Sequence, residues 1–411
     1  MKVLYPFAYY YPETCAGIYI IDNVMEAAAK AGVESLMTVP TPTRDVMEGI
    51  VWARTEKKFG DKTTIRRFHM YGEGKNPIGR AFRYLLCECI QLWYCLFKNY
   101  DVLFIDSTPP IQGLKLPLVK LFRRKPVVYN AQDIFPDSLA GTELAKKGGL
   151  LWKIGTLVMK ITYACCDKFI VISNDFKENL ITKGIPSEKI IVVYNWVDQN
   201  AVVHVDRSEN KLIKAYGIDP EKFYIEYSGN IGLTQNMDML LEVMKELKES
   251  HPKIGLILVG EGAYKKKVEA IVKRDELTNV VLLPFQPYED ISHVFSLGDV
   301  GLIISKPGVG ANSVPSKTWS IMSTSRPVLA NFDENELKDI VEKNRCGIFT
   351  KAGDKEAFKQ SILTLYNNRE LAVGMGRNGR QFVMDNLTRE VGTQKYVDVI
   401  KSVVAEAKRH G

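Results

Sequence analysis

The stretch GVGANSVPSKTWSIMSTSRPVLA, residues 308–330, decides the fold class. It follows an apolar run at residues 300–305 (VGLIIS), which is typical of a buried strand. Two glycines and small polar residues form a loop, residues 316–323 have the pattern of a helix, and another apolar run follows Pro327. This succession of strand, loop, helix and strand predicts a parallel sheet with helices packed against it.

The helix start in this stretch has the features of an anion site. Pro315 suits a first helical position because its missing N–H would be unpaired there. The free N–H groups of such a first turn attract phosphate, and Lys317 adds a full positive charge. The alternative is an ordinary connection between strand and helix with a solvent-exposed lysine.

Composition sets the class of protein. The chain has 411 residues, 46% of them hydrophobic and 25% charged, which is ordinary for a globular protein of two or three domains. Its formal net charge is +7, from 55 basic and 48 acidic residues. This excess is mild, and RNP, helix-turn-helix and zinc-finger patterns are absent, so no nucleic-acid partner is expected.

The cysteines and the amino-terminal residues indicate a cytoplasmic protein. Seven cysteines occur, an odd number without a CxxC pair, so we expect reduced, mostly buried thiols and no metal. The start MKVLYPFAYYYPE lacks the apolar core and cleavage site of a signal peptide. The most membrane-like segment, residues 84–97, contains Glu88 and is shorter than the roughly 20 residues that a span requires.

Strand and helix patterns alternate along two halves of the chain. In the first half we predict strands at residues 2–7, 33–39, 65–71, 101–106, 126–129, 168–172 and 189–194, with helices at 18–31, 79–100, 111–123, 150–165 and 174–183. In the second half we predict strands at residues 223–228, 254–259, 279–283, 300–305, 328–330 and 347–349, with helices at 236–249, 263–273, 289–297, 316–323, 334–343 and 357–366.

These patterns predict an α/β protein with two doubly wound, Rossmann-like domains that face each other across a cleft. We place the first domain at residues 1–200 and the second at 211–385. Residues 386–411 form a helical tail that packs back on the first domain. Ligands of such sheets bind at the carboxyl ends of the strands.

Loops at the predicted strand ends of the second half carry residues suited to a nucleotide. They contain Gly229-Asn230, Gly260-Glu261-Gly262 and Phe285-Gln286, besides the loop that leads to Lys317. Glycines let backbone N–H groups approach phosphate. GxGxxG and GxxxxGK[ST] are absent, which argues against a dinucleotide cofactor and against a P-loop NTPase.

An ordered set of motifs covers nearly the whole chain. They are PETCAG (12–17), AQDIFPDS (131–138), VISNDFKENL (171–180), VVYNWVD (192–198), VGEGAYKKKVE (259–269), LPFQPYEDI (283–291) and SRPVLA (325–330). This set resembles the family 4 nucleotide-sugar glycosyltransferases of GT-B fold. The nearest branch is similar to the WbuB-like amino-sugar transferases of bacterial surface-polysaccharide assembly.

The resemblance implies a role for particular residues of the first half. The loop at residues 12–17, with Glu13 and Gly17, would approach the acceptor and the donor phosphates. Asp133, with Gln132, would lie near the reacting sugar. An Asx turn or a helix cap would explain Asp133 equally well.

In the second half, the resemblance implies a donor site. Glu261 would lie near the nucleotide, Phe285 and Gln286 would offer backbone contacts to the base, and Pro315-Ser316-Lys317 would hold the diphosphate. Tight turns alone would also explain the sequences around Glu261 and Gly229-Asn230.

The chain departs from the family at several positions. Relatives often have a Glu-x7-Glu pair where Asn312 and Ser320 stand, Arg and Lys where Asn230 and Gln235 stand, and His in place of Asn130. Phosphate charge would then be met by Lys317 and helix N-termini, with Lys306 and Arg326 as helpers.

The resemblance further implies retaining, metal-independent transfer from a UDP-linked amino or deoxyamino sugar to a lipid-linked saccharide, without a cofactor. Residues 79–100 and 115–125 combine basic with aromatic and aliphatic side chains, which suits contact with the inner membrane or, alternatively, packing on the sheet. The rival functions are a sugar-nucleotide epimerase of the same fold and a non-catalytic partner subunit.

Overall fold

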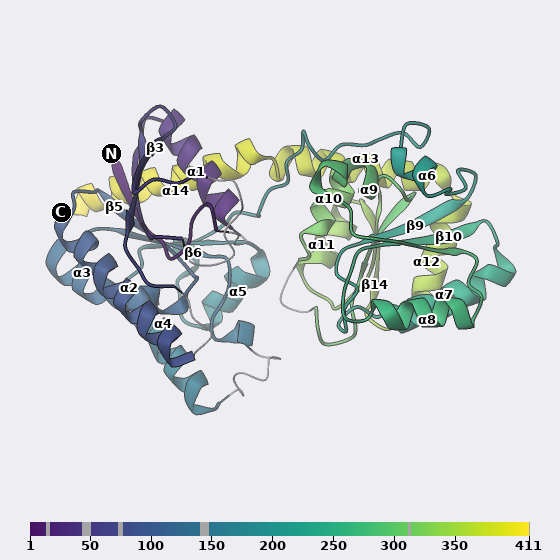
Figure 1. Ribbon diagram of the computed structural model, residues 1–411, viewed down its shortest axis with the longest axis horizontal. Coiled ribbons are helices and arrows are strands. Elements are labelled where there is room, and N and C mark those ends of the chain that lie inside the picture. Colours follow the sequence, from purple (N-terminus) through teal and green to yellow (C-terminus); the bar gives the residue numbers. More distant parts are fainter. Residues whose placement is uncertain (14–16, 43–50, 73–76, 140–147, 311–313, 411) are drawn as a thin grey trace. The chain divides into compact units, whose positions relative to one another are not determined.

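The computed structural model describes residues 1–13, 17–42, 51–72, 77–139, 148–310 and 314–410. The chain divides into two compact units (Figure 1). The first comprises Met1–Tyr194 together with Gly392–Gly411, and the second comprises Asn195–Val391. We predicted domain limits at residues 200, 211 and 385, whereas the compact units divide after Tyr194 and after Val391. The last residues of the chain belong to the first unit.

An eight-stranded sheet forms the centre of the first unit, in the order β3-β4-β2-β1-β5-β6-β7-β8. Its strands are β1 (Lys2–Pro6), β2 (Glu34–Pro40), β3 (Thr55–Lys58), β4 (Thr63–Phe68), β5 (Val102–Asp106), β6 (Val127–Ala131), β7 (Lys168–Val171) and β8 (Ile190–Val192). All neighbouring strands are parallel except β3 and β4. Buried Val, Leu, Ile and aromatic side chains make the inner strands the core.

Helices cover both faces of this sheet. They are α1 (Ile18–Lys30), α2 (Pro77–Phe97), η1 (Pro110–Lys115), α3 (Leu116–Arg123), η2 (Asp137–Leu139), α4 (Leu150–Ala164), α5 (Asn174–Thr182), η3 (Ser187–Lys189) and the end of α14 (Arg389–His410). Contacts link α2 to α3 and α3 to α4, and these three helices lie side by side in Figure 1.

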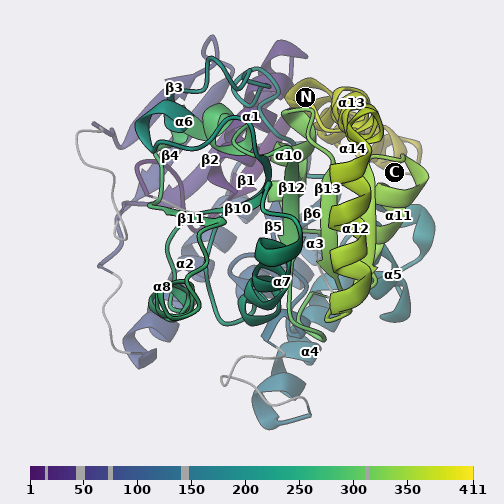
Figure 2. The same ribbon diagram turned by 90° about the vertical axis from the view of Figure 1, so that its right-hand side faces the viewer.

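The second unit has a six-stranded, wholly parallel sheet in the order β11-β10-β9-β12-β13-β14. Its strands are β9 (Phe223–Ser228), β10 (Ile254–Val259), β11 (Val280–Leu283), β12 (Val300–Ile304), β13 (Val328–Phe332) and β14 (Gly347–Lys351). Its helices are α6 (Lys211–Ala215), α7 (Met237–Ser250), α8 (Lys265–Arg274), η4 (Tyr288–Asp290), α9 (Ile291–Phe295), α10 (Lys317–Ser323), α11 (Glu336–Lys343), α12 (Lys355–Asn367) and α13 (Arg369–Asn386). One apolar cluster joins α7, α8 and α12 to the sheet, and another joins α6 and α9. Figure 2 shows α7, α8 and α12 around the strands of this sheet.

The opening stretch has the predicted order of elements: β12, a loop, α10 and β13, with Gly301 opposite Val328 in the parallel ladder. Asp333 holds the loop, because its carboxylate accepts hydrogen bonds from the N–H groups of Gly308 (2.9 Å) and Gly310 (2.7 Å). Residues 311–313, among them Asn312, lie outside the described residues.

Some elements differ from the sequence predictions. Strand β3 (TEKK) was not predicted because it is a polar edge strand without an apolar face, and it is antiparallel to β4. The short helix α6, at the start of the second predicted domain, was not predicted; Asn210 caps it by accepting from the Leu212 N–H (3.1 Å). The helix predicted at residues 111–123 begins instead as the 3-10 turn η1.

The cysteine prediction is tested at six of the seven positions. Each cysteine in the described ranges has a free thiol; Cys15 lies outside them. Four of these thiols are buried, whereas Cys89 is exposed and Cys165 is partly exposed.

Candidate functional site

The loops at the carboxyl ends of β9, β10 and β11 enclose a cavity of about 400 Å³ in the second unit. Five predicted donor-site residues line it: Gly229, Asn230, Glu261, Phe285 and Gln286. Apolar residues of the segment after β11 and of α9 complete the wall. The parallel sheet explains this grouping, because the carboxyl ends of its strands lie at one edge.

Two glycines allow the loops of this cavity to meet. A Cβ on Gly260 would lie 2.0 Å from the carbonyl oxygen of Gly229, and a Cβ on Gly262 would lie 2.3 Å from that of Ile231. Both glycines also have φ near +150°, which other residues rarely adopt (145° and 155°). The loop after β10 therefore packs directly on the loop after β9.

Hydrogen bonds fix the loop after β9. The Tyr227 hydroxyl donates to the Asn230 carbonyl (2.7 Å), and the Ile231 N–H donates to the Glu261 carbonyl (2.8 Å). The side chain of Gln235 accepts from the Gly232 N–H (3.0 Å). Gln235 thus fixes the loop by a hydrogen bond to its backbone, and it is not among the described residues that line the cavity.

Lys317 lies at the Gly229 edge of this site. Its ammonium nitrogen is 3.6 Å from the centre of the Tyr227 ring and would be 3.2 Å from a Cβ on Gly229. Burial lowers the pKa of Lys317 to about 8, while the charge of Glu226 raises it. The structure therefore brings together two of the predicted phosphate-site residues, Gly229 and Lys317.

Glu226 is a neighbour of this lysine that the sequence analysis missed. Its carboxylate oxygens are buried in β9 and have no hydrogen-bond partner among the described residues. Burial raises the pKa of Glu226 to about 8, although the charges of Lys317 and Arg326 lower it. An acidic residue in the buried run FYIEYS was the available signal.

The helix predicted at residues 316–323 is present as α10, with its start one residue later, and Pro315 precedes the helix rather than occupying its first position. Helix α10 begins at Lys317, and Ser316 precedes it without a side-chain cap. The Thr318 and Trp319 N–H groups donate to the Pro315 and Ser316 carbonyls (2.9 and 3.1 Å), so these two donors of the first turn are already engaged. Lys317 itself, rather than the helix N-terminus, is the cationic element here.

The remaining predicted donor-site residues differ in their exposure and in their hydrogen-bond partners. Glu261 is paired with Lys265 (2.6 Å), and Phe285 exposes 72% of its surface beside the cavity. The amide nitrogen of Gln286 donates to the Tyr216 hydroxyl (3.1 Å) and to the Pro284 carbonyl (2.9 Å). Ser320 lies on α10, which does not contribute to the described lining of the cavity.

Lys306 and Arg326, which we expected to assist Lys317 in binding phosphate, both contact other groups of the protein. Lys306 lies over the Tyr264 ring, 5.6 Å from its centre. Arg326 donates to the Ser296 carbonyl (3.3 Å).

In the first unit, a second cavity of about 270 Å³ lies at the carboxyl ends of β1 and β5. Three predicted site residues line it: Gly17, Gln132 and Asp133. Asp106, which was not predicted, also lines it. Gly17 precedes α1 with φ 110°, and its carbonyl accepts from the Ile21 N–H (3.2 Å). Glu13 is buried, but it is not among the described residues of this lining.

A polar network orients the side chains behind this cavity. Asn130 donates to Asp106 (3.0 Å), and its side-chain oxygen accepts from Gln132 (3.1 Å) and from the Tyr396 hydroxyl (2.9 Å). Tyr396 comes from α14 and is fully buried. The Asp133 N–H donates to the Ser107 hydroxyl (3.2 Å).

Two carboxyl groups in this cavity have raised pKa values. Burial raises the pKa of Asp106 to about 7, although hydrogen bonds from Ser107 and Asn130 lower it. Desolvation also raises the pKa of Asp133, against hydrogen bonds from Ser138 and Ile134. Raised carboxyl pKa values are frequent at catalytic sites. Asp106, at the end of the buried run DVLFID, was not predicted as a site residue.

Two α/β units with largely parallel sheets and cavities at the carboxyl ends of their strands have the architecture of a GT-B glycosyltransferase. Residues 20–201 match the family described as Glycosyltransferase Family 4, and residues 208–382 match Glycosyl transferases group 1. The chain belongs to the family 4 glycosyltransferases. The predicted family and fold are therefore confirmed, and the WbuB-like branch stays a prediction.

Individual relatives agree with this family. The chain is 21% identical to "Probable glycosyltransferase WbjE" of Pseudomonas aeruginosa over 76% of this chain and 77% of that protein. It is 20% identical to the capsular polysaccharide biosynthesis glycosyltransferase CapM of Staphylococcus aureus, over 76% and 80% of the two chains. The fold is similar to that of Anabaena Alr3699/HepE, solved in complex with UDP, with a TM-score of 0.70, 15% identity and coverage of 98% and 100%.

Proposed function

We propose that this glycosyltransferase transfers an amino or deoxyamino sugar from a UDP-linked donor to a lipid-linked saccharide. The product would enter a capsule, an O-antigen or an exopolysaccharide. The observation that carries the proposal is the cavity of the second unit, where five predicted donor residues line one space beside Lys317. The name of CapM supports the polysaccharide pathway, and the UDP bound to HepE supports the donor class.

The donor would be seated by chemistry that each side of the cavity offers. Phe285 and Gln286 would contact the base, and Glu261 would accept hydrogen bonds from the ribose in exchange for Lys265. The backbone at Gly229 and the Lys317 ammonium would meet the diphosphate. Because cationic and N–H donors act strongly where water is excluded, they would stabilise the charge on the departing UDP.

The first unit would supply the acceptor side of the reaction. Asp133 and Gln132 would face the reacting sugar, oriented by the network through Asn130 and Tyr396. Glu13 would act in the loop that precedes α1. We expect retention at the anomeric carbon and no requirement for a metal, as the family resemblance implies.

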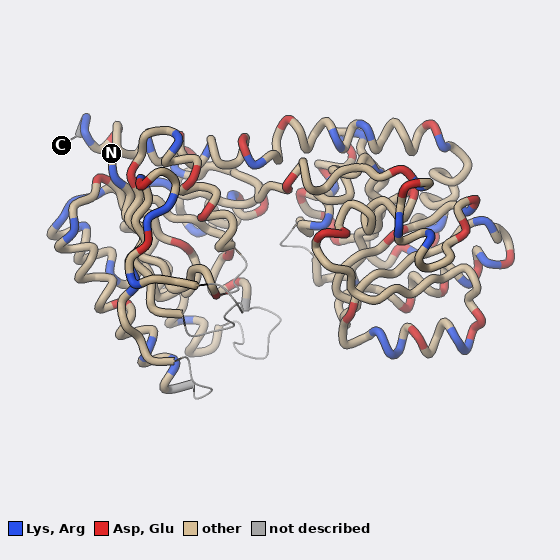
Figure 3. Tube along the Cα trace, turned by 45° about the horizontal axis from the view of Figure 1, so that its top comes forward, with Lys and Arg blue, Asp and Glu red and all other residues tan. Residues whose placement is uncertain are grey.

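Contact with an anionic membrane is part of this proposal. Large apolar side chains are exposed along α2, α3 and α4, and we call them the apolar face: Phe82, Leu85, Trp93, Phe97, Leu118, Leu121, Phe122, Leu150, Leu151, Ile154 and Leu157. In the described parts of these helices the one acidic residue, Glu88, is buried against Lys115 (2.8 Å). Basic residues lie in the same helices or directly after them, among them Arg124, Lys125 and Lys153. Figure 3 shows Lys and Arg, in blue, among the helices of the first unit.

This combination favours the surface of an anionic bilayer, since apolar side chains insert between headgroups while Lys and Arg meet the lipid charge. In the parts of the chain that the structure describes, no helix has the length and apolarity to cross a bilayer. Sedimentation with vesicles of phosphatidylcholine and phosphatidylglycerol should retain the protein at low salt and release it at high salt. Leu121→Ser with Phe122→Ser should reduce the bound fraction, whereas Leu233→Ser in the second unit should not. Absence of binding at low salt would contradict the membrane contact.

The decisive test of function has two stages. Calorimetric titration with UDP and GDP measures whether the second unit binds a nucleotide and which one. Radiolabelled sugar nucleotides are then incubated with lipid-linked acceptor extracted from membranes. Transfer supports the proposal; conversion of the free sugar nucleotide would indicate an epimerase, and binding without either reaction would indicate a non-catalytic partner subunit.

A further inference from the structure

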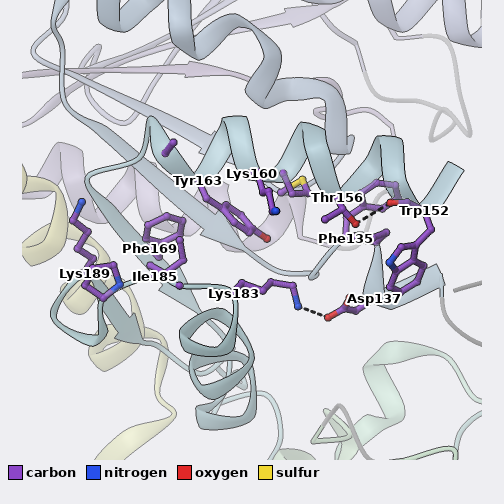
Figure 4. Close-up of a pocket in the computed structure, with 15 residues that line it drawn as sticks. Phe135, Asp137, Trp152, Thr156, Lys160, Tyr163, Phe169, Lys183, Ile185 and Lys189 are labelled. Carbon is purple, nitrogen blue, oxygen red and sulfur yellow. Dashed lines mark hydrogen bonds and ion pairs between the residues drawn. The ribbon is translucent and has the colours of Figure 1, made fainter. Parts of the chain in front are cut away.

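A third cavity, of about 450 Å³, lies in the first unit between α4 and the chain that follows α5 (Figure 4). No residue of the donor or acceptor site lines it. Its wall is formed by Phe135, Pro136, Asp137, Trp152, Thr156, Met159, Lys160, Tyr163, Ala164, Phe169, Lys183, Gly184, Ile185, Pro186 and Lys189. The aromatic and aliphatic members of this set make most of the wall apolar.

Three lysines give this apolar cavity a positive charge. Lys183 pairs with Asp137 (2.5 Å), the one carboxylate in the described lining, whose charge therefore offsets that lysine. Lys160 and Lys189 form no ion pair within the described residues, so two positive charges remain. Figure 4 shows Lys160 extending from α4 toward the segment that carries Lys183. The ligand that fits is an anion with a large apolar part.

Helix α4 presents two different faces. Trp152, Thr156, Met159 and Tyr163 recur at the spacing of one helical face and line the cavity. The opposite face, where Leu150 and Leu157 expose 75% and 59% of their surface, belongs to the apolar face. Helix α4 therefore lies between the cavity and the surface that we expect to touch lipid.

The loop after β6 connects this cavity to the acceptor site. Gln132 and Asp133 line the cavity at the carboxyl ends of β1 and β5, whereas Phe135, Pro136 and Asp137 line the one beside α4. Gly155 of α4 packs on this loop, since a Cβ there would lie 2.6 Å from the Phe135 ring. A molecule bound beside α4 thus lies a few residues along the chain from the predicted catalytic aspartate.

We propose that this cavity binds the phosphate end and first apolar units of the lipid that carries the acceptor. Lys160 meets the phosphate, and Trp152, Phe135 and Met159 contact the lipid chain. The identity of the ligand as acceptor lipid rests on the proposed function, but the chemistry, a phosphate ester of an apolar chain, rests on the cavity alone. Free phosphate would leave the aromatic wall unused.

The test uses the full-length protein and farnesyl diphosphate, a short prenyl diphosphate, below the concentration at which it forms micelles. Trp152 fluorescence and calorimetry report binding, with inorganic diphosphate and farnesol as the comparison ligands. Farnesyl diphosphate should bind at least tenfold more tightly than either, because each of them offers half of the chemistry. Trp152→Phe should remove the fluorescence change while calorimetry still records binding.

Charge variants locate the site. Lys160→Ala should weaken farnesyl diphosphate about tenfold, the effect of losing one charge-assisted contact. Lys62→Ala is the control, because Lys62 is an exposed lysine of the first unit outside the cavity lining and outside the apolar face. Binding that is absent, or equally affected by Lys62→Ala, or matched by inorganic diphosphate would overturn the inference. UDP titration of the same variants keeps the outcomes separate: the inference can fail while UDP still binds, and the donor site can fail while farnesyl diphosphate still binds.

Discussion

Replacing Lys317 with methionine tests the diphosphate site most directly. The substitution keeps the length of the side chain over the Tyr227 ring and removes the positive charge beside Gly229. No Lys or Arg is found among the described residues that line the cavity of the second unit, so Lys317 has no obvious substitute there. A hydrogen bond to a charged group contributes about 1.5–3 kcal/mol, which corresponds to a roughly 10- to 150-fold loss of affinity.

Calorimetric titration at pH 7 with UDP, UMP and uridine measures this loss. We expect Lys317→Met to weaken UDP by that factor and uridine by less than about twofold, because the nucleoside offers no phosphate to the lysine. Lys266→Met, at an exposed position on α8, is the control and should change neither affinity. Equal losses for UDP and uridine would refute the diphosphate role, since they would mean that the lysine holds the cavity in shape.

Three further predictions concern other parts of the two sites. Because burial raises the pKa of Glu226 from 4.5 to about 8, the folded state binds the proton more tightly than the unfolded state between those pH values, and stability falls as pH rises. Urea unfolding should show a loss of a few kcal/mol between pH 5 and pH 8, at about 1.4 kcal/mol per pKa unit, and Glu226→Gln should remove it. Asp133→Asn should lower the transfer rate by about 100-fold or more with little change in UDP affinity; an intact rate would exclude Asp133 from the chemistry. Gly260→Ala should lower stability by about 1–3 kcal/mol and weaken UDP, because its Cβ would meet the Gly229 carbonyl, and a variant with wild-type unfolding and UDP titrations would contradict that contact.

Periodicity made most of the fold predictable. The inner strands are continuous apolar runs, and the connecting helices have regular apolar faces. The alternation of strands and helices could therefore be predicted in both halves of the chain. Strand β3 was not, because its four residues carry no apolar pattern and it is held by pairing with β4. Pro315 lies before α10 and not at its first position, because proline suits a turn that precedes a helix as well as a first helical position.

The candidate site was predictable where loops end strands. Gly229, Asn230 and Glu261 follow parallel strands, so their grouping follows from topology. Glu226 and Asp106 were missed for a different reason: their significance depends on burial and on neighbours distant in sequence. The approach of Tyr396 to Asn130, across 266 residues, has no local signal at all.

The Tyr396–Asn130 contact also bears on how the chain is made. The first unit has its eight strands by residue 194, yet a fully buried side chain of its polar network lies in residues 392–411. During synthesis the whole second unit must emerge from the ribosome before that side chain is available. The half of the protein that is translated first is therefore completed last. A fragment that stops at Tyr194 would leave Asn130 and the Phe104 ring, on which Tyr396 packs, open to water.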